Sequence, residues 1–295
     1  MNLAHIEIGP PDAPTLVFLH GFLGCAEDWR PVMDDLARDF RCIAVDLLEH
    51  GSSRGSPPVK ASQERPHGRA ALNFIASLRE LFSRLHISRC GVIGYSMGGR
   101  LALHFALVHP EIVELLVLES ASPGIDDAHE RMARCETDEK WAVMLERDGL
   151  TKFLDAWYAQ PLFASLRARP ELLAELKKRR RDAIVPYASA LRDFSPGFVP
   201  SLWPRLAEWR APLLFIAGEL DQKYVGIGNR VAGLCPRGSL HIVRDSGHVA
   251  HEEQPGEFLS ALRNFPMIGK SRVANFQWLE KQISRKGAKL KRDTE

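Results

Sequence analysis

Residues 93–100 read Ile93-Gly94-Tyr95-Ser96-Met97-Gly98-Gly99-Arg100 and carry the strongest structural signal in the chain. A short apolar run, residues 90–93, leads into this stretch, and residues 100–107 behind it have helical composition without a breaker. Gly-x-Ser-x-Gly between a strand and a helix is typical of a sharp turn that exposes a serine hydroxyl. Glycines two positions before and after Ser96 allow a reversal in which larger side chains would collide. The sequence therefore predicts a nucleophilic Ser96 at a helix N-terminus, where backbone N–H groups favour developing negative charge.

Apolar runs elsewhere predict a fold of class α/β, with a mostly parallel sheet and helices on both of its faces. The expected strands are residues 3–8, 15–19, 42–45, 90–93, 113–118, 213–217 and 239–243. Helical spacing separates several of them, at residues 27–40, 70–85, 100–107 and 255–264.

No convincing strand pattern falls between residues 122 and 204, so the simplest organisation is one core interrupted by an inserted helical lid. We expect the core to comprise residues 1–121 and 205–266, and the lid residues 122–204. Residues 267–295 form a basic tail, which we expect to be flexible, with a short helix possible at 273–283. We assign this tail no function.

Composition narrows the function classes. The chain has 295 residues, is 45% hydrophobic and carries a net charge of +2, which gives no reason to expect a nucleic-acid partner. No window is apolar for the length of a membrane span, so none is expected. Five scattered cysteines without a C-x-x-C pair favour reduced thiols and a cytoplasmic protein. We expect no metal, because no His, Cys or Asp cluster has ligand spacing, and no cofactor.

A serine hydroxyl needs a base to accept its proton, and that base needs an acid to orient it. In this strand–helix frame the order along the chain is serine, acid, histidine. Asp221 and His248 each follow a predicted strand, at the edge where parallel sheets place their ligand sites. We therefore predict a triad of Ser96, Asp221 and His248.

The triad assignment has competitors in the sequence. Glu219 and Asp245 lie close to the predicted acid and base, and Asp221 is preferred for its place in the loop. His251 follows His248 by three residues, and His248 is preferred because Gly247 before it permits a sharp turn after the strand.

A second loop, His20-Gly21-Phe22, ends an early buried strand. An oxyanion hole in this frame takes one backbone N–H from the residue after the serine and one from such a loop. We therefore predict that the N–H groups of Phe22 and Met97 form the hole, and that His20 holds the loop by hydrogen bonds.

Together these elements resemble the α/β-hydrolase superfamily over residues 3–265. A narrower resemblance is to the MenH family, the 2-succinyl-6-hydroxy-2,4-cyclohexadiene-1-carboxylate synthases of menaquinone biosynthesis. The core motifs that carry it are His20-Gly21-Phe22-Leu23-Gly24, Glu27-Asp28-Trp29 and Gly94-Tyr95-Ser96-Met97-Gly98-Gly99-Arg100. The lid motifs are Glu119-Ser120-Ala121-Ser122-Pro123-Gly124, Glu130-Arg131-Met132-Ala133-Arg134 and Trp157-Tyr158-Ala159-Gln160-Pro161-Leu162-Phe163.

The resemblance implies a carbon–oxygen lyase rather than a hydrolase. Its substrate is a cyclohexene carboxylate with a succinyl chain and an enolpyruvyl ether, hence a small-molecule polycarboxylate. The triad would abstract a ring proton and expel pyruvate. By resemblance the substrate-site residues are Tyr95, Arg100, Arg134 and Trp157.

Guanidinium groups suit such a substrate because they bind carboxylates with two parallel hydrogen bonds. Residues 177–181 offer a third cation, and the sequence leaves open which of them faces the site. Two departures stand out: residues 46–51 replace a Pro-Gly pair found after the strand-ending aspartate in many relatives, and the loop continues to residue 68.

Two further functions remain open from sequence. The same triad serves a carboxylic-ester or carbon–carbon-bond hydrolase, which would turn over simple aryl esters. A ligand receptor of hydrolase fold is less favoured, because the Ser, Asp and His set is complete.

Overall fold

The computed structural model describes residues 2–53, 69–181 and 187–265 of the chain. The expected tail at 267–295 with its helix at 273–283, and the greater part of the loop between 49 and 68, lie outside the described residues.

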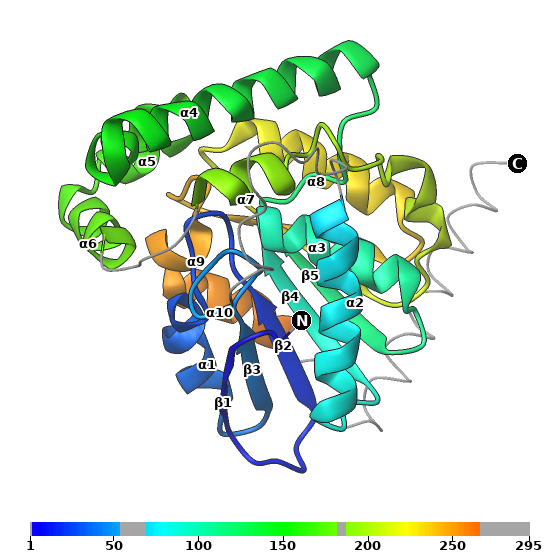
Figure 1. Cartoon of the computed structure of the whole chain (residues 1–295). Coiled ribbons are helices and arrows are strands. Elements are labelled where there is room, and N and C mark those ends of the chain that lie inside the picture. The colour runs from blue at the N-terminus through cyan, green and yellow to red at the C-terminus, as the bar shows by residue number, and fades with distance from the viewer. Residues whose placement is uncertain (1, 54–68, 182–186, 266–295) are drawn as a thin grey trace, which may run out of the picture.

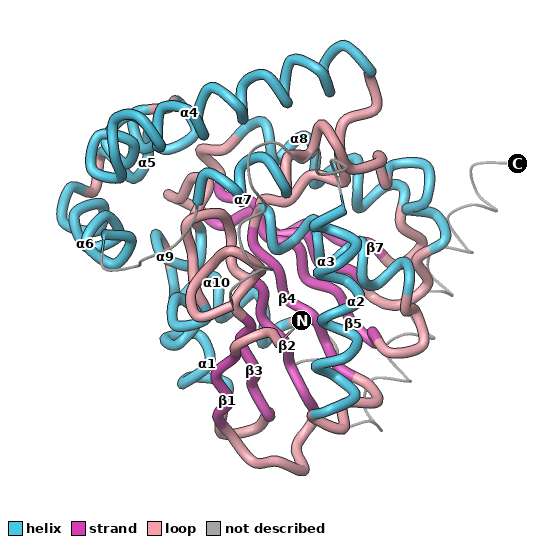
Figure 2. Tube along the Cα trace, viewed as in Figure 1, coloured by secondary structure: helices cyan, strands magenta, loops and turns pink. Residues whose placement is uncertain are grey.

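A seven-stranded sheet forms the centre of the molecule, in the order β1-β3-β2-β4-β5-β6-β7 (Figure 2). Only β1 runs antiparallel, against β3, and the other pairs are parallel. The predicted α/β class with a mostly parallel sheet is therefore confirmed. The strands are β1 (His5–Ile8), β2 (Thr15–Leu19), β3 (Arg41–Val45), β4 (Cys90–Tyr95), β5 (Val113–Glu119), β6 (Leu213–Gly218) and β7 (Gly238–Val243).

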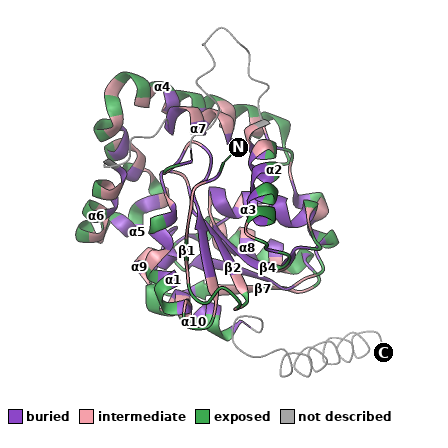
Figure 3. Ribbon diagram, turned by 60° about the horizontal axis from the view of Figure 1, so that its bottom comes forward, coloured by how far each residue is buried: buried purple, intermediate pink, exposed green. Residues whose placement is uncertain are grey.

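Helices cover both faces of the sheet, which explains why the central strands are continuous apolar runs (Figure 3). Side chains alternate along each strand, so that Val17 and Leu19 of β2 face one core and Leu16 and Phe18 the other. The first core includes α2 (Arg69–Arg84), α3 (Met97–Val108) and α8 (Gln222–Leu234). The second includes η1 (Ala26–Trp29), α1 (Arg30–Leu36), α9 (Ala250–Glu253) and α10 (Pro255–Asn264).

The prediction of a single helix at residues 27–40 is wrong in its bounds and continuity. The chain first forms the 3₁₀ turn η1, and α1 begins at Arg30 with Pro31 in its first turn. Because proline has no backbone N–H, it suits the start of a helix and not its interior. The helix then ends at Leu36.

Between β5 and β6 the chain leaves the sheet and forms a helical insertion, which lies over the carboxyl ends of the strands (Figure 1). Its core packs onto Leu23, which follows β2, and Val249, which follows β7. None of the helices in the described ranges is both long and apolar enough to cross a membrane. The insertion comprises α4 (Ala128–Ala159), η2 (Pro161–Phe163), α5 (Ala164–Arg167), α6 (Pro170–Arg181) and α7 (Tyr187–Asp193), and η3 (Trp203–Glu208) leads back to the sheet.

The two ends of the insertion lie beside each other and form a narrow neck. The backbone N–H of Leu202 donates to the carbonyl of Pro123 at 2.8 Å. The indole N–H of Trp203 donates to the carbonyl of Gly124 at 3.2 Å. The insertion therefore leaves and re-enters the sheet domain at one place.

Candidate active site

Ser96 lies at the junction of β4 and α3 in a strained conformation, with φ of 50° and ψ of −109°. The turn is crowded: a Cβ added to Gly98 would lie 2.3 Å from the carbonyl oxygen of His20, and one added to Gly94 would lie 2.6 Å from the Cα of Gly99. The backbone N–H of Ser96 donates to the carbonyl of Glu119 at 2.8 Å, which ties the turn to β5. The glycines are therefore required by close backbone approach.

The structure brings the three predicted triad residues into one hydrogen-bonded chain. Nε2 of His248 lies 3.2 Å from the hydroxyl of Ser96, and Nδ1 lies 2.8 Å from a carboxylate oxygen of Asp221. Asp221 and His248 are buried, whereas Ser96 is half-buried. With Nδ1–H donating to Asp221, Nε2 is free to accept the serine proton.

The competing residues have other partners. Glu219 accepts a hydrogen bond from the backbone of Asp245 at 3.2 Å. His251 donates from Nδ1 to the buried carboxylate of Glu119, at 2.9 and 2.8 Å from its two oxygens. The chain past β7 thus places one histidine toward Ser96 and the next away from it.

The loop that contains Phe22 lies against the nucleophile turn. A Cβ on Gly21 would lie 2.6 Å from the ring of Tyr95 and 3.5 Å from the Cβ of Ser96. Met97 is the first residue of α3, so its N–H has no acceptor within that helix. Met97 therefore follows Ser96 directly, and the residue before Phe22 lies against the nucleophile turn.

Two buried histidines hold this loop in place. Nε2 of His20 accepts from the backbone N–H of Leu47 at 3.0 Å, and Nε2 of His50 accepts from that of Leu23 at 3.3 Å. Burial lowers the pKa of both imidazoles, that of His50 to about 3. Both rings are therefore neutral, as their acceptor role requires. His20 has the structural role expected from the sequence.

The segment at 46–51 forms a compact turn, although it lacks the Pro-Gly pair. The carboxylate of Asp46 accepts from the backbone N–H groups of Ala26, at 2.6 Å, and Ser52, at 2.7 Å. Gly51 lies directly against this carboxylate with φ of +52°, a conformation that glycine adopts without strain. Asp46 thus organises the turn and anchors it to η1.

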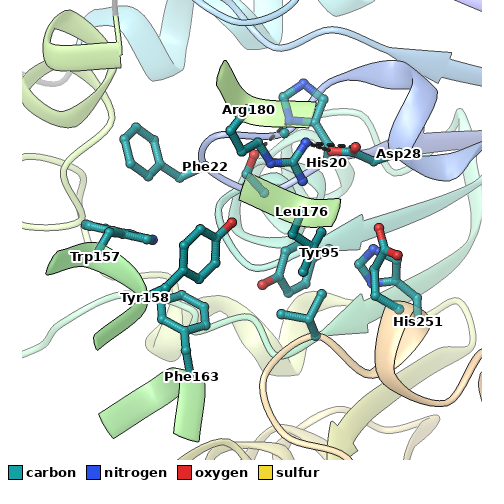
Figure 4. A pocket seen from close by; sticks show the side chains of 14 residues that line it. His20, Phe22, Asp28, Tyr95, Trp157, Tyr158, Phe163, Leu176, Arg180 and His251 are labelled. Carbon is teal, nitrogen blue, oxygen red and sulfur yellow. Dashed lines mark hydrogen bonds and ion pairs between the residues drawn. The ribbon is translucent and has the colours of Figure 1, made fainter. Parts of the chain in front are cut away.

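A cavity of about 450 Å³ opens beside the nucleophile turn, between the sheet and the insertion (Figure 4). Two of the residues expected at the substrate site, Tyr95 and Trp157, line it. The ring of Trp157 lies 5.0 Å from that of Phe22 and packs on Phe153 and Trp141 at 5.5 and 5.3 Å. Burial raises the pKa of Tyr95 well above its ordinary value, so its phenol is a neutral donor. Aromatic rings line the wall together with charged side chains, among them Asp28, Arg180 and Glu252.

Within residues 177–180, Arg180 is the cation that lines the cavity (Figure 4). Its guanidinium is 9% exposed and lies 2.6 Å from the carboxylate of Asp28. Burial opposes the charge of Arg180, but Asp28 outweighs it and raises the pKa. Lys177 instead pairs with exposed Asp155 at 2.7 Å. Arg179 reaches Asp28 and also Glu252, at 2.6 Å from the latter.

Arg100 and Arg134 do not line this cavity, although they lie close to each other. Burial, followed by the neighbouring charge of Arg134, lowers the pKa of Arg100 to about 10. One guanidinium nitrogen of Arg100 donates to the carbonyl of Phe194 at 2.8 Å. Nε of Arg134 is held by both oxygens of buried Asp138, at 2.9 and 2.8 Å.

Tyr224 lies near both this pair of arginines and the triad, and it was not among the predicted site residues. Its ring lies 4.8 Å from that of His248. Burial and the charge of Asp221 raise its pKa, whereas Arg134 and Arg100 oppose that rise. Its position three residues after the predicted acid, within the first turn of α8, was the available signal.

The family model described as alpha/beta hydrolase fold matches residues 14–255. A Bacillus subtilis protein is 36% identical to this chain, over 90% of this chain and 94% of the relative's length. That protein is provisionally named 2-succinyl-6-hydroxy-2,4-cyclohexadiene-1-carboxylate synthase. The synthase of that name from Salmonella paratyphi C is 33% identical, over 86% of this chain and 94% of its own.

Among solved structures, MenH from S. aureus superimposes with a TM-score of 0.79 and 31% identity, over 88% of this chain and 95% of that one. The match in sequence extends over both the sheet and the insertion. The chain therefore belongs to the α/β-hydrolase fold family and, within it, to the MenH family.

Proposed function

We propose that the protein is a carbon–oxygen lyase, a 2-succinyl-6-hydroxy-2,4-cyclohexadiene-1-carboxylate synthase that eliminates pyruvate from an enolpyruvyl-succinyl-cyclohexene carboxylate. The observation that carries this proposal is the pairing of a hydrogen-bonded Ser96–His248–Asp221 chain with nearby arginines, one of which, Arg180, lines the cavity beside the nucleophile turn. The family membership described above supports the choice of reaction. An elimination is redox-neutral, so the proposal requires no cofactor.

In the proposed mechanism His248 accepts the hydroxyl proton of Ser96, and Asp221 stabilises the imidazolium that forms. The serine oxygen then takes a ring proton from the substrate. The electron pair left on the ring shifts to form the new double bond, and the bond between the ring and the enolpyruvyl oxygen breaks. The ring proton restores the hydroxyl of Ser96. The His248 imidazolium gives its proton to the released enolate, which becomes pyruvate, and His248 returns to its neutral form.

Negative charge grows on a substrate oxygen while the ring proton is removed. The backbone N–H groups of Phe22 and Met97 are proposed to stabilise that charge, assisted by the N-terminus of α3. Preorganised donors of this kind account for ~100-fold to 1,000-fold each in related chemistry.

Three arginines are proposed to hold the carboxylates of the substrate. Arg100 and Arg134 lie near Tyr224, whose ring contacts that of His248, and Arg180 lines the cavity. Tyr95 and Trp157 would pack against the ring between them. We propose that residues 122–204 serve as a lid for this site.

We propose a cytoplasmic location, because free thiols are typical of proteins in a reducing compartment. The described cysteines are all free, and burial raises the pKa of Cys25, Cys42, Cys90 and Cys235, so these thiols are unreactive.

The test is pyruvate release from the enolpyruvyl substrate, generated in situ, by wild type and Ser96→Ala. Release by wild type alone supports the lyase. Hydrolysis of aryl esters without pyruvate release would contradict it and favour the ester hydrolase with the same triad.

A further inference from the structure

One carboxylate holds the backbone on both sides of His248. The N–H of Gly247 donates to Oε2 of Glu253 at 3.0 Å, and the N–H of Val249 donates to Oε1 of the same side chain at 3.2 Å. These are the two residues that flank His248 in the chain. The position of the imidazole therefore depends on the position of the Glu253 carboxylate.

Glu253 is fully buried, and its charge is compensated from the insertion. Its side chain is 0% exposed, and NH1 of Arg169 lies 3.1 Å from Oε2. NH2 of Arg169 donates to the carbonyl of Asp245, two residues before Gly247. A buried carboxylate without a counter-charge is strongly destabilised, and Arg169 supplies the counter-charge that Glu253 requires.

The segment that contains Arg169 also packs directly on the loop of His248. A Cβ on Gly247 would lie 2.0 Å from the hydroxyl of Ser165. The rings of Phe163 and His248 meet edge to face, with centroids 5.9 Å apart. Residues 163–169 thus make three contacts with this region. Phe163 contacts the imidazole of His248, Ser165 contacts the backbone of Gly247, and Arg169 pairs with the carboxylate of Glu253, which holds the loop.

We propose that Glu253 and Arg169 are positioning residues for His248, which they hold at hydrogen-bonding distance from Ser96. This rests on the proposed role of His248 as the base that activates Ser96. Neither residue touches the reacting atoms. Small displacements of a base lower reaction rates steeply, so loosening this loop lowers the reactivity of Ser96.

Arg167 offers a matched control for Arg169. It lies two residues earlier, and its guanidinium donates to the carbonyls of Tyr158, at 3.0 Å, and Gln160, at 2.7 Å, both within the insertion. Arg167→Met therefore removes an arginine and its hydrogen bonds from the same segment without touching the loop of His248.

The experiment measures the second-order rate at which a fluorophosphonate labels Ser96 in the full-length protein. Labelling requires an activated serine but not the native substrate. We expect Arg169→Met to lower the rate ~10-fold or more, Arg169→Lys to retain much of it, and Arg167→Met to match wild type. In pyruvate release, Arg169→Met should lower kcat by a larger factor than it raises KM, because Val249 is the part of this loop that lines the cavity.

Equal labelling of wild type and Arg169→Met would overturn the proposal, as would an equal loss in Arg169→Met and Arg167→Met. Absence of labelling in wild type would also overturn it, because His248 would not then activate Ser96. Normal labelling with the expected pattern but no pyruvate release would contradict the proposed substrate and still support the positioning role. Glu253→Gln is a second variant: a glutamine can accept from only one of the two N–H groups, so its labelling rate should also fall.

Discussion

Glu119 and His251 form a buried pair beside the nucleophile turn, in which the backbone N–H and the Nδ1–H of His251 both donate to the Glu119 carboxylate. The imidazole stacks on Trp29, with centroids 4.6 Å apart, and meets the edge of Tyr95 at 5.0 Å. The carbonyl of Glu119 accepts from the N–H of Ser96. The pair therefore supports the turn through the backbone of Glu119 and the ring of Tyr95.

The first prediction concerns the pH dependence of stability. Burial alone would lower the pKa of His251, but the charge of Glu119 and its hydrogen bond outweigh burial and raise it. A histidine with a raised pKa in the folded state stabilises the fold at pH values below its unfolded-state pKa of about 6.5. This contribution is lost as the pH rises through the pKa of the folded state. The stability difference between wild type and His251→Gln should therefore be largest near pH 6 and shrink above it. Urea unfolding across this range measures it, with exposed His129→Gln as control; a constant difference would contradict the prediction.

The second prediction concerns glycines. Gly98→Ala places a Cβ 2.3 Å from backbone, so the turn must shift, and we expect loss of activity together with a stability loss of about 1–3 kcal/mol. Gly226→Ala lies at an exposed position of α8, where no atom lies within 4 Å of the added Cβ. This change should stabilise the fold by about 0.5–1 kcal/mol. Thermal unfolding compares the two. Equal effects would show that close packing is not why position 98 is glycine.

The third prediction concerns carboxylate binding by α4. Arg134→Gln should raise KM for the enolpyruvyl substrate about 10-fold and affect kcat less, because a charge-assisted hydrogen bond is lost at a partly exposed site. Asp138→Asn should raise KM by a smaller factor, since it frees the guanidinium that Asp138 fixes. Arg147→Gln, on the same helix at 73% exposure, is the control. A KM unchanged in Arg134→Gln would remove this residue from the site.

The fourth prediction concerns the buried pair of Asp28 and Arg180. Asp28→Asn leaves a buried guanidinium with less compensation and should destabilise by about 3–5 kcal/mol. Arg180→Met should also destabilise, because the charge of Asp28 then depends on Arg179. The double variant should lose less than the sum of the two, since each change removes the need for the other. Chemical unfolding of all four proteins measures the coupling, and simple additivity would show that the two charges are independent.

The sheet and the triad were predictable because their signals are local. Apolar runs mark buried strands wherever they lie, and the glycines around Ser96 report a crowded turn directly. Asp221 and His248 could be selected because strands of one parallel sheet end at one edge. The prediction of one helix at residues 27–40 was wrong in its bounds, because apolar spacing does not reveal that a new helix begins just before Pro31.

The remaining parts of the site depend on how distant segments dock. Five consecutive cations, residues 177–181, end α6, and only the docking of that helix beside η1 brings Arg180 to Asp28, 152 residues away. The pairs Glu119–His251 and Arg169–Glu253 likewise join segments that no local pattern connects.

The neck at Pro123, Gly124, Leu202 and Trp203 has a consequence for how such enzymes diversify. Because the polypeptide departs and returns through adjacent, hydrogen-bonded positions, residues 125–200 can be exchanged for those of a relative without cutting a single strand pairing. Recombination at these two points would transplant a set of substrate contacts, including Arg134, Trp157 and Arg180, in one event. Ser96, Asp221 and His248 would be inherited unchanged from the recipient. The transplanted insertion would nevertheless have to supply a cation that pairs with Glu253. Any such chimaera therefore needs a basic residue at the position of Arg169.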